Sequence, residues 1–243
     1  MPTLSSIAAQ IESRIPGAFT KYQRTLGELL PTGIPAVDEC GIRTATLTQI
    51  CSSSECTSAR TSILVSLLAG ATANDQFCAL IDPSDSFDPA GASTVVSLER
   101  LLWVRCSRTK GSNNTQLTPL EKAFKATDII LQNGGFRVIA VDLGDFPETA
   151  VRKIPMTTWF RLARVVEKTD TALVFLLAYP AAQSCAGLTL ETQTVDAVWD
   201  ESCISHGRLL LGTKHELIVC RRQDKKLPSS EKSAFEIARW ARY

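Results

Sequence analysis

Residues 46–64 read TLTQICSSSECTSARTSIL. The segment begins with an apolar run typical of a buried strand, continues through small polar residues, and ends in a pattern typical of a helix. A strand, a loop and a helix in this order are the frame of a phosphate-binding loop. In such a loop, backbone N–H groups surround the phosphate and a lysine reaches its terminal oxygens. The segment therefore predicts a frame for nucleotide binding whose chemistry depends on four positions.

The four positions keep little of that chemistry. The pattern requires Gly, four residues, Gly, Lys and then Ser or Thr, and the corresponding residues are Ser54, Ala59, Arg60 and Thr61. Ser54 and Ala59 place a Cβ where glycine would give conformational freedom and close approach to phosphate. Arg60 keeps the positive charge in a bulkier, planar group. Only Thr61 matches, and its hydroxyl would be a ligand for Mg²⁺.

The rest of the chain predicts an α/β domain with a mainly parallel sheet flanked by helices, because apolar strands and helical patterns alternate from Ala45 to Leu177. The capping-box pattern of Thr118 and Glu121 marks one helix start, and Gly134-Gly135 marks its end. Strands are predicted at 45–51, 77–81, 101–106, 136–142, 171–177, 188–192, 208–212 and 216–221, and helices at 61–73, 119–133 and 159–168.

Both ends of the chain are interpreted as extensions of a core at residues 31–222. Apolar residues at helical spacing predict an N-terminal helical extension within residues 1–30. Residues 223–243 form a basic tail, in which Ser230 is a candidate cap for a C-terminal helix at 230–243. Arginines, lysines and a tryptophan of this end are candidates for contact with single-stranded DNA or a partner protein: Arg221, Arg222, Lys225, Lys226, Arg239, Trp240 and Arg242. The alternative is a helix packed by its tryptophan.

The composition fits a folded protein of the cytoplasm. Of 243 residues, 44% are hydrophobic, which is enough for a sizeable core, and the formal charge of +1 neither predicts nor excludes nucleic-acid binding. The eight cysteines include no CxxC pair, so neither a zinc site nor another metal site is predicted. The sequence shows no signal-peptide pattern and no apolar run long enough to cross a bilayer. We therefore expect a cytoplasmic protein that does not enter the membrane.

Carboxylates follow two of the predicted strands. Asp142 ends the strand 136–142, where a Walker-B carboxylate would hold Mg²⁺. The alternative is a carboxylate that caps the turn after its strand. Hydrolysis of a nucleotide also requires a group that activates water, and the candidates after the strand 77–81 are Asp82, Asp85 and Asp88.

The order of these segments resembles the RecA recombinase core, and more closely the ImuA family of RecA-like proteins. The RecA likeness is carried by residues 32–38, 46–62, 78–82, 87–89 and 138–142, and the ImuA likeness by residues 86–90, 101–106, 126–136 and 159–162. Together these segments span about residues 30–222. The resemblance implies a RecA-like P-loop NTPase core. It also implies an accessory role in the SOS response to DNA damage, in error-prone translesion synthesis, with an ImuB-like polymerase relative and an error-prone polymerase as partners.

Two further positions depart from RecA at its chemistry. Ser84 stands at the position that matches the catalytic Glu of RecA, and Ala178 stands at the position of the Gln that senses the γ-phosphate. We therefore expect a non-hydrolysing scaffold without a cofactor, although Thr61 and Asp142 keep two groups that a Mg·ATP site would use. One alternative is an ATP-dependent recombinase in which Arg60 contacts the phosphate. Another is a regulator that binds RecA filaments.

Overall fold

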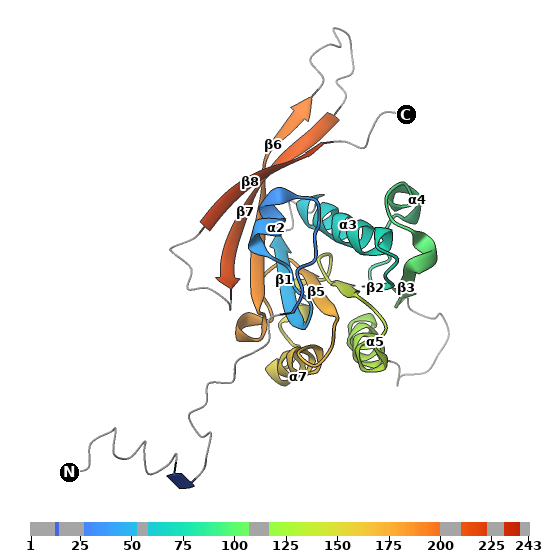
Figure 1. The fold of residues 1–243 in the computed structure, drawn as a ribbon, viewed down its shortest axis with the longest axis vertical. Helices are drawn as coiled ribbons and strands as arrows, with labels where there is room; N and C mark the ends of the chain where they lie inside the picture. Colours follow the sequence, from blue (N-terminus) through green and yellow to red (C-terminus); the bar gives the residue numbers. More distant parts are fainter. Residues whose placement is uncertain are drawn as a thin grey trace, which may run out of the picture.

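The strands belong to one sheet with the order β3-β2-β4-β5-β1-β6-β7-β8 (Figure 1). The computed structural model describes residues 13–14, 27–52, 58–106, 117–199, 210–222 and 231–238. Neighbouring strands from β3 to β6 are parallel, and the pairs β6–β7 and β7–β8 are antiparallel. The strands are β1 (Thr46–Ser52), β2 (Cys78–Asp82), β3 (Leu101–Arg105), β4 (Val138–Asp142), β5 (Ala172–Leu177), β6 (Leu188–Trp199), β7 (Leu210–Arg222) and β8 (Glu231–Ala238).

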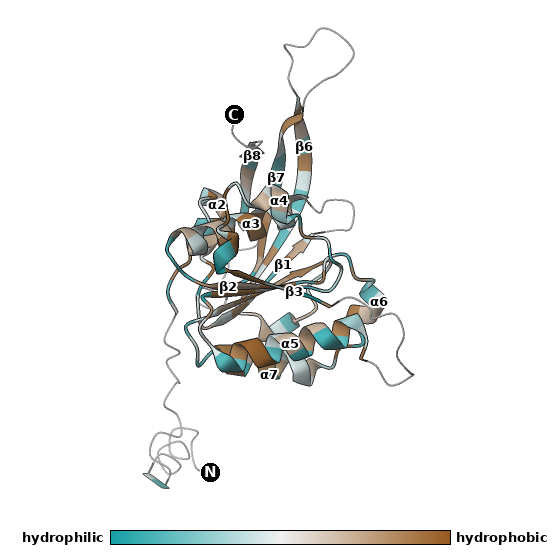
Figure 2. Cartoon of the chain, turned by 90° about the vertical axis from the view of Figure 1, so that its right-hand side faces the viewer, coloured by the Kyte–Doolittle hydropathy of each residue, from teal (hydrophilic) through white to brown (hydrophobic). Residues whose placement is uncertain are grey.

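Helices cover both faces of the parallel part of the sheet (Figure 2). One face packs against α3, with α2 beside it, and the other packs against α5 and α7. Strands buried on both faces read as continuous apolar runs, which explains the run that forms β5. The helices are α2 (Pro35–Cys40), α3 (Ser58–Ala73), α4 (Pro89–Ala92), α5 (Pro119–Asn133), α6 (Glu148–Val151) and α7 (Met156–Val166), with short 3-10 turns at η1 (Leu98–Arg100) and η2 (Gln183–Cys185).

Strand β1 lies inside the sheet and is held on both sides by partners distant in sequence. It pairs with β5 on one side and with β6 on the other. The buried amide of Gln49 adds a side-chain link, because its Nε2 donates to Thr189 Oγ1 (2.8 Å) and its Oε1 accepts from the Ala182 backbone N–H (3.0 Å). Both polar atoms of this buried amide are therefore satisfied, as burial requires.

The predicted α/β class with a mainly parallel sheet is confirmed. The first residue of α5 is determined by nearby residues. Thr118 Oγ1 accepts from the Glu121 N–H (3.2 Å), and Glu121 Oε2 accepts from the Thr118 N–H (2.7 Å). This is the reciprocal capping box that the sequence predicts. The end of α5 also agrees, because Gly134 forms the C-cap with a φ of 70°.

The C-terminal part of the sheet differs from the prediction. The expected helix at 230–243 is wrong over its described part, because residues 231–238 form strand β8, which pairs with β7. The two strands expected at 208–212 and 216–221 are a single strand, β7. Buried His215 of β7 packs on the ring of Phe235 of β8, with ring centroids 5.3 Å apart. This contact helps to hold β8 to the sheet.

Strands β6 and β7 extend beyond the helix-covered part of the sheet (Figure 1). Their far ends carry exposed apolar side chains at Val195, Trp199 and Leu210. The predicted N-terminal helix lies almost entirely outside the described residues. Within the described ranges, no helix combines the length and the apolar character needed to span a membrane.

Candidate functional site

Three central strands end at the same edge of the sheet, close to the start of α3. β1 ends at Ser52, β5 at Leu177 and β4 at Asp142, and the register pairs Cys51 with Leu177 and Asp142 with Leu176. In open α/β sheets, ligands bind outside the carboxyl ends of the parallel strands. The fold therefore brings Arg60 and Asp142, both predicted site residues, to the edge where a ligand would be expected.

The Arg60 side chain is buried against this edge. Its exposed fraction is 2%, although it lies in the first turn of α3. Its Nη1 donates to Ser52 Oγ (3.2 Å) and to the Leu177 carbonyl oxygen (3.4 Å), and its Nη2 lies 3.5 Å from Asp145 Oδ1. The guanidinium group thus connects the end of β1, the end of β5 and the turn after β4.

Gly144 provides the surface on which the guanidinium lies. A Cβ built on Gly144 would lie 1.9 Å from both Cζ and Nη2 of Arg60, a distance that no side chain could accept. The glycine is needed at this position for close approach rather than for an unusual backbone conformation. The Arg60 Nε has no hydrogen-bond partner among the described residues, so one donor of the guanidinium group is left unpaired. The group is held mainly by its two Nη atoms and by packing.

Asp142 forms the turn that presents Gly144. Its Oδ1 accepts from the Gly144 N–H at 3.0 Å, which is the capping role named as the alternative to Mg²⁺ binding. Burial raises the pKa of Asp142, while the Gly144 hydrogen bond and the charge of Arg60 oppose the rise. The Asp142 carboxylate is therefore engaged by the turn that follows its own strand.

The carboxylates considered for water activation have structural partners. Asp82 is buried and accepts from the N–H groups of Ser86 (3.2 Å) and Phe87 (3.0 Å) and from the indole of Trp103 (3.2 Å). Asp85 forms a two-bond ion pair with Arg105, which lowers the pKa of Asp85. Asp88 caps α4 by accepting from the Ala90 N–H at 3.0 Å. Each of these groups therefore has a defined role in shaping the segment after β2.

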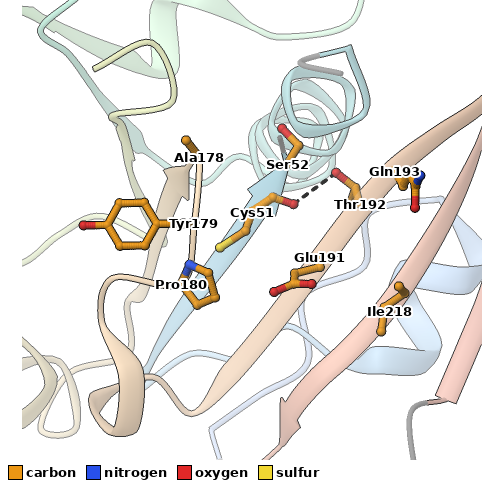
Figure 3. A pocket seen from close by; sticks show the side chains of 9 residues that line it. All are labelled: Cys51, Ser52, Ala178, Tyr179, Pro180, Glu191, Thr192, Gln193 and Ile218. Carbon is orange, nitrogen blue, oxygen red and sulfur yellow. Dashed lines mark hydrogen bonds between the residues drawn. The ribbon is translucent and has the colours of Figure 1, made fainter. Parts of the chain in front are cut away.

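A cavity of about 400 Å³ lies beside Ser52 at the same edge (Figure 3). Its described walls include Cys51 and Ala178, and they contain one carboxylate, Glu191, and no lysine or arginine. Burial strongly raises the pKa of the Cys51 thiol, so this sulfur is neutral rather than a nucleophilic thiolate. The described walls of this cavity therefore offer no cation to a phosphate group.

The other predicted site residues are more widely spread. Ala59 is fully buried in the core, and Thr61 is exposed on α3, where it lines a separate groove with Thr32 and Val65. Arg221 and Arg222 end β7, and Arg222 Nη1 donates to the Glu39 carbonyl oxygen at 3.2 Å. Positions outside the described residues are Ser54, Lys225, Lys226, Arg239, Trp240 and Arg242.

Sequence reasoning did not find the partners of Arg60. These partners come from separate parts of the chain: Ser52, Gly144, Asp145 and Leu177. Leu177 contributes only its main-chain carbonyl oxygen, and Gly144 contributes only the space that the absence of a side chain leaves. The one available signal is the Gly144-Asp145 pair, one residue beyond the end of a buried strand, where a turn is expected. Within the described ranges, no group of three or more His, Cys, Asp or Glu side chains is placed to hold a metal ion.

No protein-family model matches this sequence. A search of curated proteins likewise gave no match. The chemistry of the site is therefore the main guide to function.

Proposed function

We propose that this chain is a non-hydrolysing scaffold protein with a RecA-like P-loop core whose phosphate loop has lost its activity. The observation that carries the proposal is the burial of Arg60, the residue at the position of the phosphate-binding lysine. Its guanidinium group is bound to Ser52 and Leu177 and faces Asp145. A side chain that binds a phosphate group must direct its positive charge at the ligand. The Arg60 guanidinium is instead directed at Ser52, Leu177 and Asp145 of its own chain.

The remaining requirements of hydrolysis support the same conclusion. Turnover needs a metal-binding carboxylate and a group that activates water. Asp142 caps its own turn, and Asp82 accepts three hydrogen bonds that hold the segment after β2. Ala178, at the end of β5, has no polar side-chain group with which to sense a terminal phosphate. A RecA-like core in which all these groups are absent or otherwise engaged is better suited to binding other proteins than to driving a reaction.

The process that we propose is error-prone translesion synthesis in the SOS response to DNA damage. The support is the likeness to the ImuA family in residues 86–90, 101–106, 126–136 and 159–162. In this role the chain binds an ImuB-like polymerase relative and helps to bring an error-prone polymerase to damaged DNA. Contact with RecA or with single-stranded DNA belongs to the same proposal.

The first test is nucleotide turnover by the purified full-length chain. We expect phosphate release from Mg·ATP at the rate of the protein-free blank, with or without single-stranded DNA. A RecA recombinase in the same assay is the positive control. The Arg60→Ala and Arg161→Ala variants should give the same blank rate. Hydrolysis above the blank would instead show that the chain is an ATPase. Its loss in Arg60→Ala, at a temperature at which circular dichroism shows this variant folded, would assign the phosphate contact to Arg60.

The second test concerns the partner. We expect the chain to co-purify with an ImuB-like polymerase relative when the two are produced together, and to leave strand exchange by RecA filaments at its normal rate. The matched control is an unrelated protein of similar size produced with the same polymerase relative. Lack of a complex, together with altered strand exchange, would favour a regulator of RecA over the scaffold.

A further inference from the structure

Helices α5 and α7 lie on the same face of the sheet (Figure 2). A groove between their outer residues combines apolar and basic side chains. It has a volume of about 610 Å³. We call it the α7 groove. It is lined chiefly by Leu131, Phe160, Arg161, Arg164, Val165 and Lys168. These residues do not overlap with those around Arg60, so the groove is a separate feature of the molecule.

The helical periodicity of α7 explains why aromatic and basic side chains lie on its solvent-facing side. Trp159, Leu162 and Val166 face the sheet and are buried. Phe160 and Arg164, four residues apart, lie together on the outer side of the helix, and Lys168 follows just after the helix ends. Phe160 is 47% exposed, so about half of its surface can still be covered by a partner.

The charges of the groove have one sign. Arg161, Arg164 and Lys168 line it, and its described lining contains no carboxylate. Arg161 lies 3.7 Å from Asp128. Neither Arg164 nor Lys168 forms an ion pair with another described residue, and both are exposed. Two cations beside an exposed aromatic ring are therefore available for a negatively charged partner.

We propose that the α7 groove binds an acidic peptide segment of a partner protein, with one bulky apolar residue of that segment inserted beside Phe160. The apolar floor of Leu131 and Val165 fits such an anchor, and the cations fit flanking carboxylates. Single-stranded nucleic acid fits less well, because it is usually held by several aromatic rings and a longer track of cations. Among the described lining residues, Phe160 is the single aromatic ring.

The proposal adds a docking surface and the chemistry of its ligand to the scaffold role, but it does not depend on the phosphate site. The two can fail separately. Hydrolysis of ATP would refute the scaffold proposal and leave peptide binding unchanged. A groove that binds no acidic peptide would refute this inference and leave the ATPase result unchanged.

The test is the binding of a fluorescent twelve-residue peptide that carries a central Leu-Phe pair flanked by Asp and Glu, measured by anisotropy with the full-length chain. We expect Arg164→Glu and Phe160→Ala each to weaken binding at least about tenfold, which corresponds to 1.4 kcal/mol. Raising the salt concentration should weaken binding to the unaltered chain. Both side chains are exposed, so neither change should unfold the protein.

Two matched controls separate the groove from general effects of charge and hydrophobicity. Lys153→Glu reverses an exposed charge outside the groove, and Ile129→Ala removes an exposed apolar side chain of α5 that does not line it. Neither should change the affinity more than twofold. Equal losses in Arg164→Glu and Lys153→Glu, or no binding of the peptide at millimolar concentration, would overturn the proposal. Tighter binding of a dT20 oligonucleotide, lost in the same two groove variants, would also overturn it and assign the groove to nucleic acid.

Discussion

The Arg60→Ala variant is expected to lose about 3 kcal/mol of unfolding free energy. The change removes a side chain with 2% exposure together with its hydrogen bonds to Ser52 and Leu177. It also leaves the Leu177 carbonyl without this donor and opens a cavity beside Gly144. Urea denaturation followed by circular dichroism measures the effect. A phosphate-binding cation directed toward solvent would give a much smaller loss.

Two comparisons make the Arg60 result specific. Arg161→Ala removes an arginine that is 57% exposed, and it should cost less than about 1 kcal/mol. Gly144→Ala should cost about 2 kcal/mol in the unaltered chain, because its new methyl group meets the guanidinium. In the Arg60→Ala background, the same glycine change should cost almost nothing. Additive costs in this double-mutant cycle would show that the two residues do not touch.

The Trp159→Ala variant is expected to lose about 4 kcal/mol of unfolding free energy, the largest effect of a single substitution proposed for this chain. Trp159 is a residue of α7, and its side chain is buried against the sheet. Its ring packs edge-on against Phe124 (5.4 Å between centroids) and Phe175 (4.8 Å). Removing the indole takes one neighbour from Phe124 and from Phe175, which still stack on each other, and leaves a cavity that the surrounding backbone cannot fill. The midpoint of urea denaturation should therefore fall sharply.

The neighbouring aromatic residue is the control for Trp159. Phe160 lies one position further along α7 but is 47% exposed, so Phe160→Ala should change the unfolding free energy by less than about 1 kcal/mol. Similar losses for the two variants would mean that α7 is rotated relative to the sheet. That outcome would also remove the basis of the α7 groove.

Local signals in the sequence predicted most of the parallel sheet and its helices. The apolar runs of β2, β4 and β5 are recognisable because strands buried on both faces need side chains that are apolar throughout. The start of α5 depends on Thr118 and Glu121, three residues apart, and such short-range interactions are visible in sequence. The order of the strands in the sheet, by contrast, depends on pairing between distant segments, and local sequence patterns do not predict it.

The C-terminal strand was misread because its pattern is ambiguous. In the sequence, Phe235, Ile237, Ala238 and Trp240 would also offer an apolar surface to a C-terminal helix. The burial of Phe235 between the exposed residues Ala234 and Glu236 shows the alternation of a strand. Short apolar patterns fit both periods, and here pairing with β7 decides between them.

For the site, the sequence places Arg60 at the start of a helix after the first central strand, but it does not give the direction of the side chain. The pattern around Arg60 identified the first turn of α3, yet it left open whether the cation faces a ligand or the protein. That choice depends on Gly144, which lacks a side chain, and on the Leu177 carbonyl, which every residue type would provide. Neither contribution can be recognised from residue types before the strands are placed.

The position of β1 also has a consequence for the order of events during synthesis. The Gln49 amide bonds to Thr189, a residue 140 positions further along the chain, and β6 supplies the whole second neighbour of β1. Bringing such distant residues together costs chain entropy before any contact is gained. Strand β1, the first of the described strands along the chain, is thus among the last of them to gain both neighbours, because its second edge stays unpaired until β6 has been made.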